Sequence, residues 1–253
     1  MTDARGLKVV ILGAASAMAE ATARLYAAEG ASIALVGRDA ARLDAIAADL
    51  VARGAAAAPV HVRDLAAMQE IGPALDTIAA GLGGIDHVLL FYGILGDQRR
   101  AAADLDAARA ILDTDFTSAA LWSLAAADRL EQAGSGALVV VGSVAGDRGR
   151  QSNYVYGAAK AGLATLVQGI AHRFALRGGR LRAVVVKPGF VDTPMTEGLK
   201  KGGPLWATPD RVAAVIRQAA DRGGPVVYAP WFWRFILLVI RLVPSPVFHR
   251  TKL

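Results

Sequence analysis

Short apolar runs alternate with longer alanine-rich segments along most of this chain. Runs such as VVIL at positions 9–12 are apolar at successive positions, which is typical of strands buried on both faces of a parallel sheet. The segments between them have the length and composition of helices, and right-handed crossovers place such helices on both faces. The pattern therefore predicts a doubly wound α/β sheet. Its expected strands are Lys8–Leu12, Ser32–Val36, Pro59–Val62, His87–Leu90, Ala137–Val141, Leu181–Lys187 and Val226–Tyr228, and its expected helices are Ala17–Glu29, Ala40–Arg53, Met68–Leu82, Asp104–Gln132, Tyr154–Leu176 and Pro209–Asp221.

Length and composition narrow the class of protein. The chain has 253 residues, 54% of them hydrophobic, and no Pro/Ser-rich linker, so we expect one domain over residues 1–230 and an extension over 231–253. It has no cysteine, which excludes disulfides and cysteine-ligated metals. Its four histidines stand at no metal-ligand spacing, so no metal site is expected. The N-terminal MTDARG carries an acid and precedes an apolar run too short for a signal peptide, which predicts a cytoplasmic protein.

Positive charge is concentrated near the C-terminus. The net charge is +6, and residues 222–253 hold five cations and no acid, namely Arg222, Arg234, Arg241, Arg250 and Lys252. These cations lie beside tryptophans and an apolar run, which favours a membrane surface over nucleic acid. The apolar stretch between Arg234 and Arg241 is far shorter than the roughly 20 residues that span a bilayer. We therefore expect a hydrophobic, basic helix at the membrane interface, with packing on a partner subunit or over the substrate pocket as the alternative.

A turn of small residues separates the first strand from the first helix. In an open α/β sheet, such a turn brings backbone N–H groups at a helix start close to a pyrophosphate. Gly13 is followed by Ala17 and Ala19, which is the spacing G-x-x-x-G-x-G with alanine at the second and third glycines. Taken alone, this turn is compatible with dinucleotide binding and with ordinary packing of a strand on a helix.

The end of the second strand bears on the choice of nucleotide. A carboxylate there accepts hydrogen bonds from the ribose hydroxyls of NAD, whereas a guanidinium pairs with the 2′-phosphate of NADP. Gly37 stands in the carboxylate's place and Arg38 follows it. We expect NADP, with NAD as the alternative if Arg38 is a solvated loop residue.

The segment 142–162, GSVAGDRGRQSNYVYGAAKAG, is the most specific in the chain. Tyr156 and Lys160 are four residues apart, so one helical turn places them on the same face, and Ser143 arrives from the end of the preceding strand. A phenol with a pKa near 10 becomes an acid or base only when a cation favours its phenolate, and Lys160 is that cation. Ser143 can hydrogen-bond an oxygen whose charge changes during hydride transfer. Tyr154 falls on the wrong side of the helix.

The run KPGFVDTP, at positions 187–194, follows the sixth expected strand. It therefore lies at the carboxyl edge of the sheet, where ligands bind in such folds. The backbone of Val191 is placed to reach a carboxamide, and the Thr193 hydroxyl a nicotinamide or a phosphate. An ordinary Pro-Gly turn is the alternative.

These segments resemble the short-chain dehydrogenase/reductase superfamily over essentially residues 7–230. The resemblance implies a Rossmann-type sheet of about seven parallel strands, hydride transfer to or from NAD(P), and a homodimer or homotetramer built on the long helices. It implies Tyr156 as acid/base, Ser143 as orienting residue and Lys160 on the nicotinamide ribose. The implied cofactor contacts are Gly13, Ala15, Ser16, Met18, Arg38, Val62, Asp64, Tyr92, Gly93, Tyr156, Lys160, Pro188, Gly189, Val191 and Thr193.

One segment and two single residues depart from the pattern of that family. The motif Asn-Asn-Ala-Gly after the fourth strand is replaced by LFYG at 90–93, and His61 replaces the residue that contacts adenine. The fourth active-site residue, an asparagine that holds a proton-relay water, is replaced by Asp115. A carboxylate can hold water too, but it adds a negative charge near Lys160 and is expected to change the pH profile.

A closer likeness is to the reductases that act on decaprenylphosphoryl 2-keto-pentose. It rests on FYGILGDQ, VYGAAKAG, PGFVDTPMTEGLK and the tail YAPWFWRFILLVIRLVPSPVFHR, although Arg38 departs from the NADH-using members of that group. The first hypothesis is thus an oxidoreductase that interconverts a ketone and a secondary alcohol on a lipid-linked keto-sugar or another amphiphilic molecule. The second is a reductase of soluble ketones or 3-oxoacyl thioesters, with the tail used for oligomerisation. The third is a non-catalytic nucleotide-binding protein.

Overall fold

One parallel sheet organises the chain. The computed structural model describes residues 6–198 and 202–251. Seven strands lie in the order β3-β2-β1-β4-β5-β6-β9, so the strand order reverses between β1 and β4. The expected doubly wound sheet is confirmed. Its strands are β1 (Lys8–Leu12), β2 (Ser32–Gly37), β3 (Val60–Val62), β4 (His87–Leu90), β5 (Ser135–Val141), β6 (Arg180–Pro188) and β9 (Val226–Ala229), and a separate pair joins β7 (Phe190–Val191) to β8 (Trp206–Ala207).

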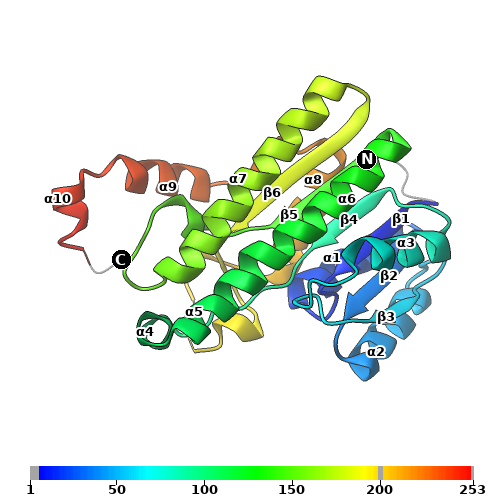
Figure 1. Cartoon of the computed structure of the whole chain (residues 1–253), viewed down its shortest axis with the longest axis horizontal. Helices are drawn as coiled ribbons and strands as arrows, with labels where there is room; N and C mark the ends of the chain where they lie inside the picture. Colours follow the sequence, from blue (N-terminus) through cyan, green and yellow to red (C-terminus); the bar gives the residue numbers. More distant parts are fainter. Residues whose placement is uncertain (1–5, 199–201, 252–253) are drawn as a thin grey trace.

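Helices cover both faces of the sheet (Figure 1). In β1, Val9 and Ile11 face one hydrophobic core while Val10 and Leu12 face the other. This alternation explains why the strands are apolar at every position. The first core is closed by α1 (Ala17–Ala28), α2 (Ala40–Ala52) and α8 (Pro209–Arg222), and the second by α3 (Ile71–Leu82), α6 (Ala119–Ala133) and α7 (Tyr154–Arg177).

The single helix expected over Asp104–Gln132 is wrong in detail. The chain instead forms α4 (Gln98–Ala103), α5 (Leu105–Leu112), a π-helical turn η1 (Asp113–Ser118) and then α6. Asp104 begins α5 by accepting hydrogen bonds from the backbone N–H groups of Asp106 and Ala107. The π-helical turn carries Asp115 inward, and such turns are frequent at functional sites.

The C-terminal segment forms α9 (Trp233–Leu242) and the short α10 (Ser245–Phe248). Both extend from the rest of the chain at the red end of the colour scale (Figure 1). Trp233 and Leu237 of α9 are buried against Val144, which belongs to the 3-10 turn η2 (Val144–Asp147) directly after Ser143. The tail therefore packs on the loop that leads from β5 to α7.

Candidate active site

Ser143, Tyr156 and Lys160 meet at the carboxyl edge of the sheet. Ser143 follows β5, and Tyr156 and Lys160 lie one turn apart near the start of α7. The Tyr156 hydroxyl hydrogen-bonds Ser143, and the Lys160 Nζ lies 5.6 Å from the centre of the tyrosine ring. Tyr154, by contrast, is 46% exposed. The arrangement brings a phenol, a hydroxyl and an ammonium close together.

Asp115 is the buried partner of Lys160. Its Oδ1 lies 3.0 Å from Lys160 Nζ, and the side chains are 0% and 5% exposed. Both carboxylate oxygens also accept from the Ile94 backbone N–H, at 3.2 Å. Burial raises the pKa of Asp115, and the ion pair with Lys160 offsets only part of that rise. The π-helical turn thus places a charged group where the resemblance implies a neutral amide.

The electrostatics of Tyr156 are set by opposing influences. Burial raises the pKa of its phenol, the positive charge of Lys160 lowers it, and the negative charge of Asp115 raises it again. The hydrogen bond from Ser143 lowers it slightly. Burial alone lowers the pKa of Lys160, but its interactions with Tyr156 and Asp115 raise that pKa above its ordinary value. Lys160 therefore stays charged, and without a further cation Tyr156 stays protonated.

Gly93 makes room for this ion pair. A Cβ at Gly93 would lie 2.2 Å from Asp115 Oδ1 and 3.0 Å from Lys160 Nζ. Real Cβ atoms do not approach other atoms this closely, so the site requires glycine here. The neighbouring Tyr92 hydrogen-bonds Ser118 of the π-helical turn, with 2.9 Å between the hydroxyl oxygens.

The turn after β1 fits the phosphates of a dinucleotide. Gly13 has φ +85°, and a Cβ there would lie 2.8 Å from Tyr92 Cβ, so this position requires glycine. Ala15 and Ser16 complete the turn, and Met18 lies in the first turn of α1. The Ser16 side chain makes no capping hydrogen bond to a described residue, which leaves N–H groups at the start of α1 available to an anion.

The residues expected around the adenosine lie at the ends of β2 and β3. Arg38 is exposed directly after β2, and its side chain pairs with no residue in the described part of the chain. Val62 ends β3 and is 59% exposed. Asp64 accepts a hydrogen bond from the Ala66 backbone N–H at 3.0 Å. Arg38 and Val62 therefore lie at the same end of two paired strands, and both side chains are exposed.

The loop after β6 brings Pro188, Gly189, Val191 and Thr193 to the same edge. Val191 is buried in β7, and Thr193 precedes the turn η3 (Pro194–Thr196). Trp233 packs against this loop, a contact that the sequence did not predict. Its indole lies 1.9 Å from where a Gly189 Cβ would be, so it covers this glycine closely. A glycine beside the site and a distant tryptophan form no pattern in the sequence, so only the folded chain reveals their contact.

The exposed side of α9 is apolar. Phe235 is 55% exposed, Leu238 51%, Val239 64% and Leu242 73%, and Trp231 just before the helix is 68% exposed. Within the described residues, no helix is both long enough and apolar enough to span a bilayer.

Comparison with known proteins agrees with this geometry. The family model for short chain dehydrogenases matches residues 7–203. An uncharacterized oxidoreductase of Mycobacterium tuberculosis is 43% identical over 254 residues, 99% of each chain. A cis-4-hydroxycyclohexanecarboxylate dehydrogenase of Sinomonas cyclohexanicum is 36% identical over 75% of each chain. A solved structure described as a short chain dehydrogenase/reductase family protein has a TM-score of 0.77 and 28% identity, and the match covers 90% of this chain and 97% of that one. The chain therefore belongs to the short-chain dehydrogenase/reductase family and is an NAD(P)-dependent oxidoreductase.

Proposed function

We propose that the protein interconverts a ketone and a secondary alcohol. The observation that carries this proposal is the meeting of Tyr156 with Ser143 and Lys160. In reduction, Tyr156 gives its proton to the carbonyl oxygen, and Ser143 donates a hydrogen bond to the same oxygen. Lys160 holds its positive charge beside the phenolate that remains. A nicotinamide held at this edge of the sheet would supply or accept the hydride.

The proposal is tested by following nicotinamide absorbance with a panel of ketones and secondary alcohols. The panel should hold cyclic ketones, a 3-oxoacyl thioester and a lipid-linked keto-sugar. Turnover of at least one carbonyl is expected. Tight nucleotide binding without turnover of any member would favour a non-catalytic nucleotide-binding protein.

We propose an amphiphilic substrate, of which a lipid-linked keto-sugar is one example. Support comes from the aromatic side chains around the loop after β6. Phe190 stacks on Trp206 with 5.3 Å between ring centres, and it meets Trp233 edge-on at 5.6 Å. Aromatic walls favour a substrate with an extended apolar part. Reduction of a soluble ketone is the alternative, favoured by a relative named for a dehydrogenase of a hydroxycyclohexane acid.

NADP is the proposed nucleotide, and Arg38 is the residue that selects it. Replacing Arg38 with alanine should weaken NADPH binding about tenfold or more and leave NADH binding little changed, because a charge-assisted hydrogen bond contributes about 1.5–3 kcal/mol. Titration calorimetry with both nucleotides measures the ratio. Arg53→Ala, at the far end of α2, is the control and should leave the ratio unchanged. Equal affinities for NADPH and NADH in the unmodified protein would contradict the assignment.

Asp115 is proposed as a positioning residue that acts through Lys160 and Tyr156. Because the negative charge of Asp115 raises the pKa of Tyr156, Asp115→Asn should lower that pKa. Alcohol oxidation needs the phenolate and ketone reduction needs the phenol, so both limbs of the pH–rate profile should move to lower pH. Asp113→Asn, which removes an exposed carboxylate paired with Arg109, is the control. An unmoved profile in Asp115→Asn would exclude this role.

We propose that the exposed face of α9 contacts an anionic membrane surface on its cytoplasmic side. The apolar residues Phe235, Val239 and Leu242 lie beside cations, and each cation near such a surface contributes about 1 kcal/mol. Val239→Ser removes apolar area without touching the buried Trp233, and it should reduce sedimentation with anionic vesicles. Salt should weaken binding without abolishing it. Failure of the unmodified protein to sediment at low salt would contradict this contact.

A homodimer or homotetramer is also proposed, built on the outer side of α6. Leu121 and Leu124 there are 40% and 41% exposed, in a helix whose other side is fully buried. Light scattering of the full chain tests this assembly.

A further inference from the structure

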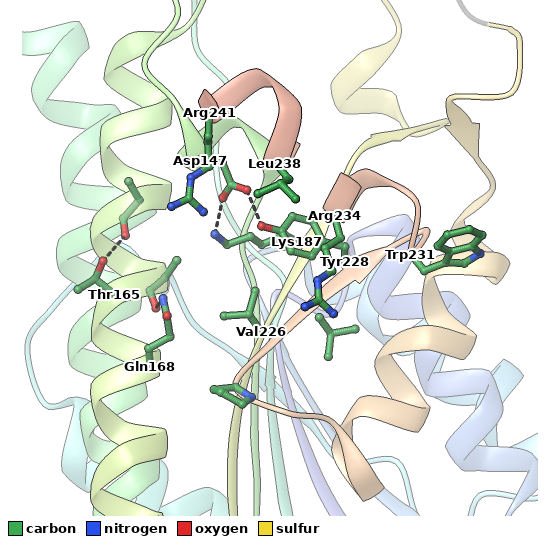
Figure 2. A pocket seen from close by; sticks show the side chains of 15 residues that line it. Asp147, Thr165, Gln168, Lys187, Val226, Tyr228, Trp231, Arg234, Leu238 and Arg241 are labelled. Carbon is green, nitrogen blue, oxygen red and sulfur yellow. Dashed lines mark hydrogen bonds and ion pairs between the residues drawn. The ribbon is translucent and has the colours of Figure 1, made fainter. Parts of the chain in front are cut away.

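A hollow of about 830 Å³ lies between α7, β9 and α9 (Figure 2). Thr165 and Gln168 of α7 form one wall, and Val226 and Tyr228 of β9 form part of the other. None of Ser143, Tyr156 and Lys160 lines it. The hollow is therefore separate from the catalytic residues.

A polar cluster forms the floor of this hollow. Lys187 and Tyr228 are side by side on β6 and β9, where they are partners in the strand register. The Lys187 ammonium donates to Asp147 Oδ1, and the Tyr228 hydroxyl donates to Asp147 Oδ2 at 2.6 Å (Figure 2). The side chains of Asp147 and Lys187 are 1% and 10% exposed. The carboxylate is fully engaged and its charge is balanced by Lys187.

Two further cations line the hollow, and neither is paired with a carboxylate of the described residues. Arg234 and Arg241 lie seven residues apart on α9, about two turns, and both line the hollow (Figure 2). Neither side chain forms an ion pair with a residue in the described ranges, 6–198 and 202–251. Since Lys187 and Asp147 cancel, the hollow carries two net positive charges. It is complementary to an anion with several acceptor oxygens.

The rim of the hollow indicates what carries that anion. Trp231 and Leu238 line the hollow and are also 68% and 51% exposed. They continue into the exposed apolar face formed by Phe235, Val239 and Leu242. An occupant that satisfies both features has an anionic head and an apolar body. A membrane lipid combines these properties and presents them at the surface where an amphipathic helix lies.

We propose that this hollow binds the phosphate-bearing headgroup of an anionic membrane lipid, with Arg234 and Arg241 holding the phosphate and Trp231 and Leu238 contacting the lipid's apolar part. The inference rests on the proposed contact of α9 with a membrane and adds a defined headgroup site to it. General attraction of a basic tail would respond equally to the loss of any of its arginines, whereas a headgroup site responds to these two.

The first experiment uses monomeric dihexanoyl phosphatidic acid with the full chain, followed by tryptophan fluorescence, with dihexanoyl phosphatidylcholine and inorganic phosphate as comparisons. Arg241→Gln and Arg234→Gln should each weaken binding of phosphatidic acid about tenfold. Arg250→Gln is the matched control, since it removes the same charge from an exposed tail residue that does not line the hollow. Equal losses in all three variants, or equal binding of phosphatidylcholine, would overturn the proposal. Inorganic phosphate binding as tightly as phosphatidic acid would show a plain anion site and overturn the lipid assignment.

The second experiment repeats the comparison with vesicles that contain phosphatidic acid. Arg241→Gln should sediment less than Arg250→Gln, while both keep the thermal unfolding midpoint of the unmodified protein. Binding to monomeric lipid without binding to vesicles would reject the membrane contact and overturn the assignment of the hollow to a membrane lipid. A dimer that dissociates on Val239→Ser, with no lipid binding, would assign the face to a second copy and overturn the proposal. Ketone turnover, measured without lipid, reports on the proposed reaction independently of both outcomes.

Discussion

Tyr156→Phe is expected to remove nearly all turnover and to leave nucleotide binding largely intact. The change deletes one hydroxyl, which is the only part of the side chain that can exchange a proton with the substrate oxygen. General acid–base groups contribute about 10²–10⁴-fold to rate, and the loss should fall in kcat. The ring remains, so the packing of α7 at this position is preserved. Steady-state kinetics with a ketone selected from the panel measures the loss, and calorimetry with the nucleotide measures binding.

Tyr154→Phe is the matched control. It removes the same atom two residues away, from a side chain that is 46% exposed. Its kcat should stay close to that of the unmodified protein. If Tyr154→Phe were the more damaging change, the acid/base would be wrongly assigned.

Gly93→Ala should disrupt the ion pair between Asp115 and Lys160. The added Cβ meets Asp115 Oδ1 at 2.2 Å, so the carboxylate and its ion pair with Lys160 must move. Overpacking of this kind costs about 1–3 kcal/mol of folding free energy. A displacement of about 1 Å at a catalytic group lowers rate by about 10²-fold. Lower kcat together with a lower unfolding midpoint is therefore expected.

Gly81→Ala separates this local clash from a general effect of replacing glycine. Gly81 lies in α3, and a Cβ there meets no described atom within 4 Å. Since alanine favours a helix over glycine by about 1 kcal/mol, Gly81→Ala should be neutral or stabilising. Unchanged kinetics in Gly93→Ala would mean that the ion pair adapts without consequence, contrary to the role proposed for Asp115.

Two of the departures from the family pattern, at Tyr92 and at Asp115, are structurally connected. Tyr92 replaces a small residue after β4, and its hydroxyl bonds Ser118 in the same π-helical turn that carries Asp115. Tyr92 also approaches Gly13 so closely that Gly13 must lack a side chain. The segment that replaces the family's asparagine motif therefore contacts both the turn after β1 and the π-helical turn that carries Asp115. It links Gly13 to the ion pair of Asp115 with Lys160.

Local patterns were sufficient for the strands, the face shared by Tyr156 and Lys160, and the family. A buried parallel strand is apolar at every position, and one helical turn is four residues, so both can be recognised within a short window. The cofactor contacts of Gly13 and Arg38 stay predictions, which rest on the strand that each residue follows. The π-helical turn cannot be recognised this way, because Asp115 is drawn inward by Lys160 and Ile94, which lie far from it in sequence.

The sequence by itself determined the doubly wound sheet and the one-turn spacing of Tyr156 and Lys160, because both depend on the periodicity of neighbouring residues. It also determined that the tail is apolar and basic, and that the apolar stretch between Arg234 and Arg241 is too short to span a bilayer. Only the tertiary structure decided which side of that tail is free. Trp233 and Leu237 bury one side against Val144, which leaves Phe235, Val239 and Leu242 exposed. Because most residues of α9 are apolar, its sequence does not show which side is buried; that depends on contacts with residues far away in the chain.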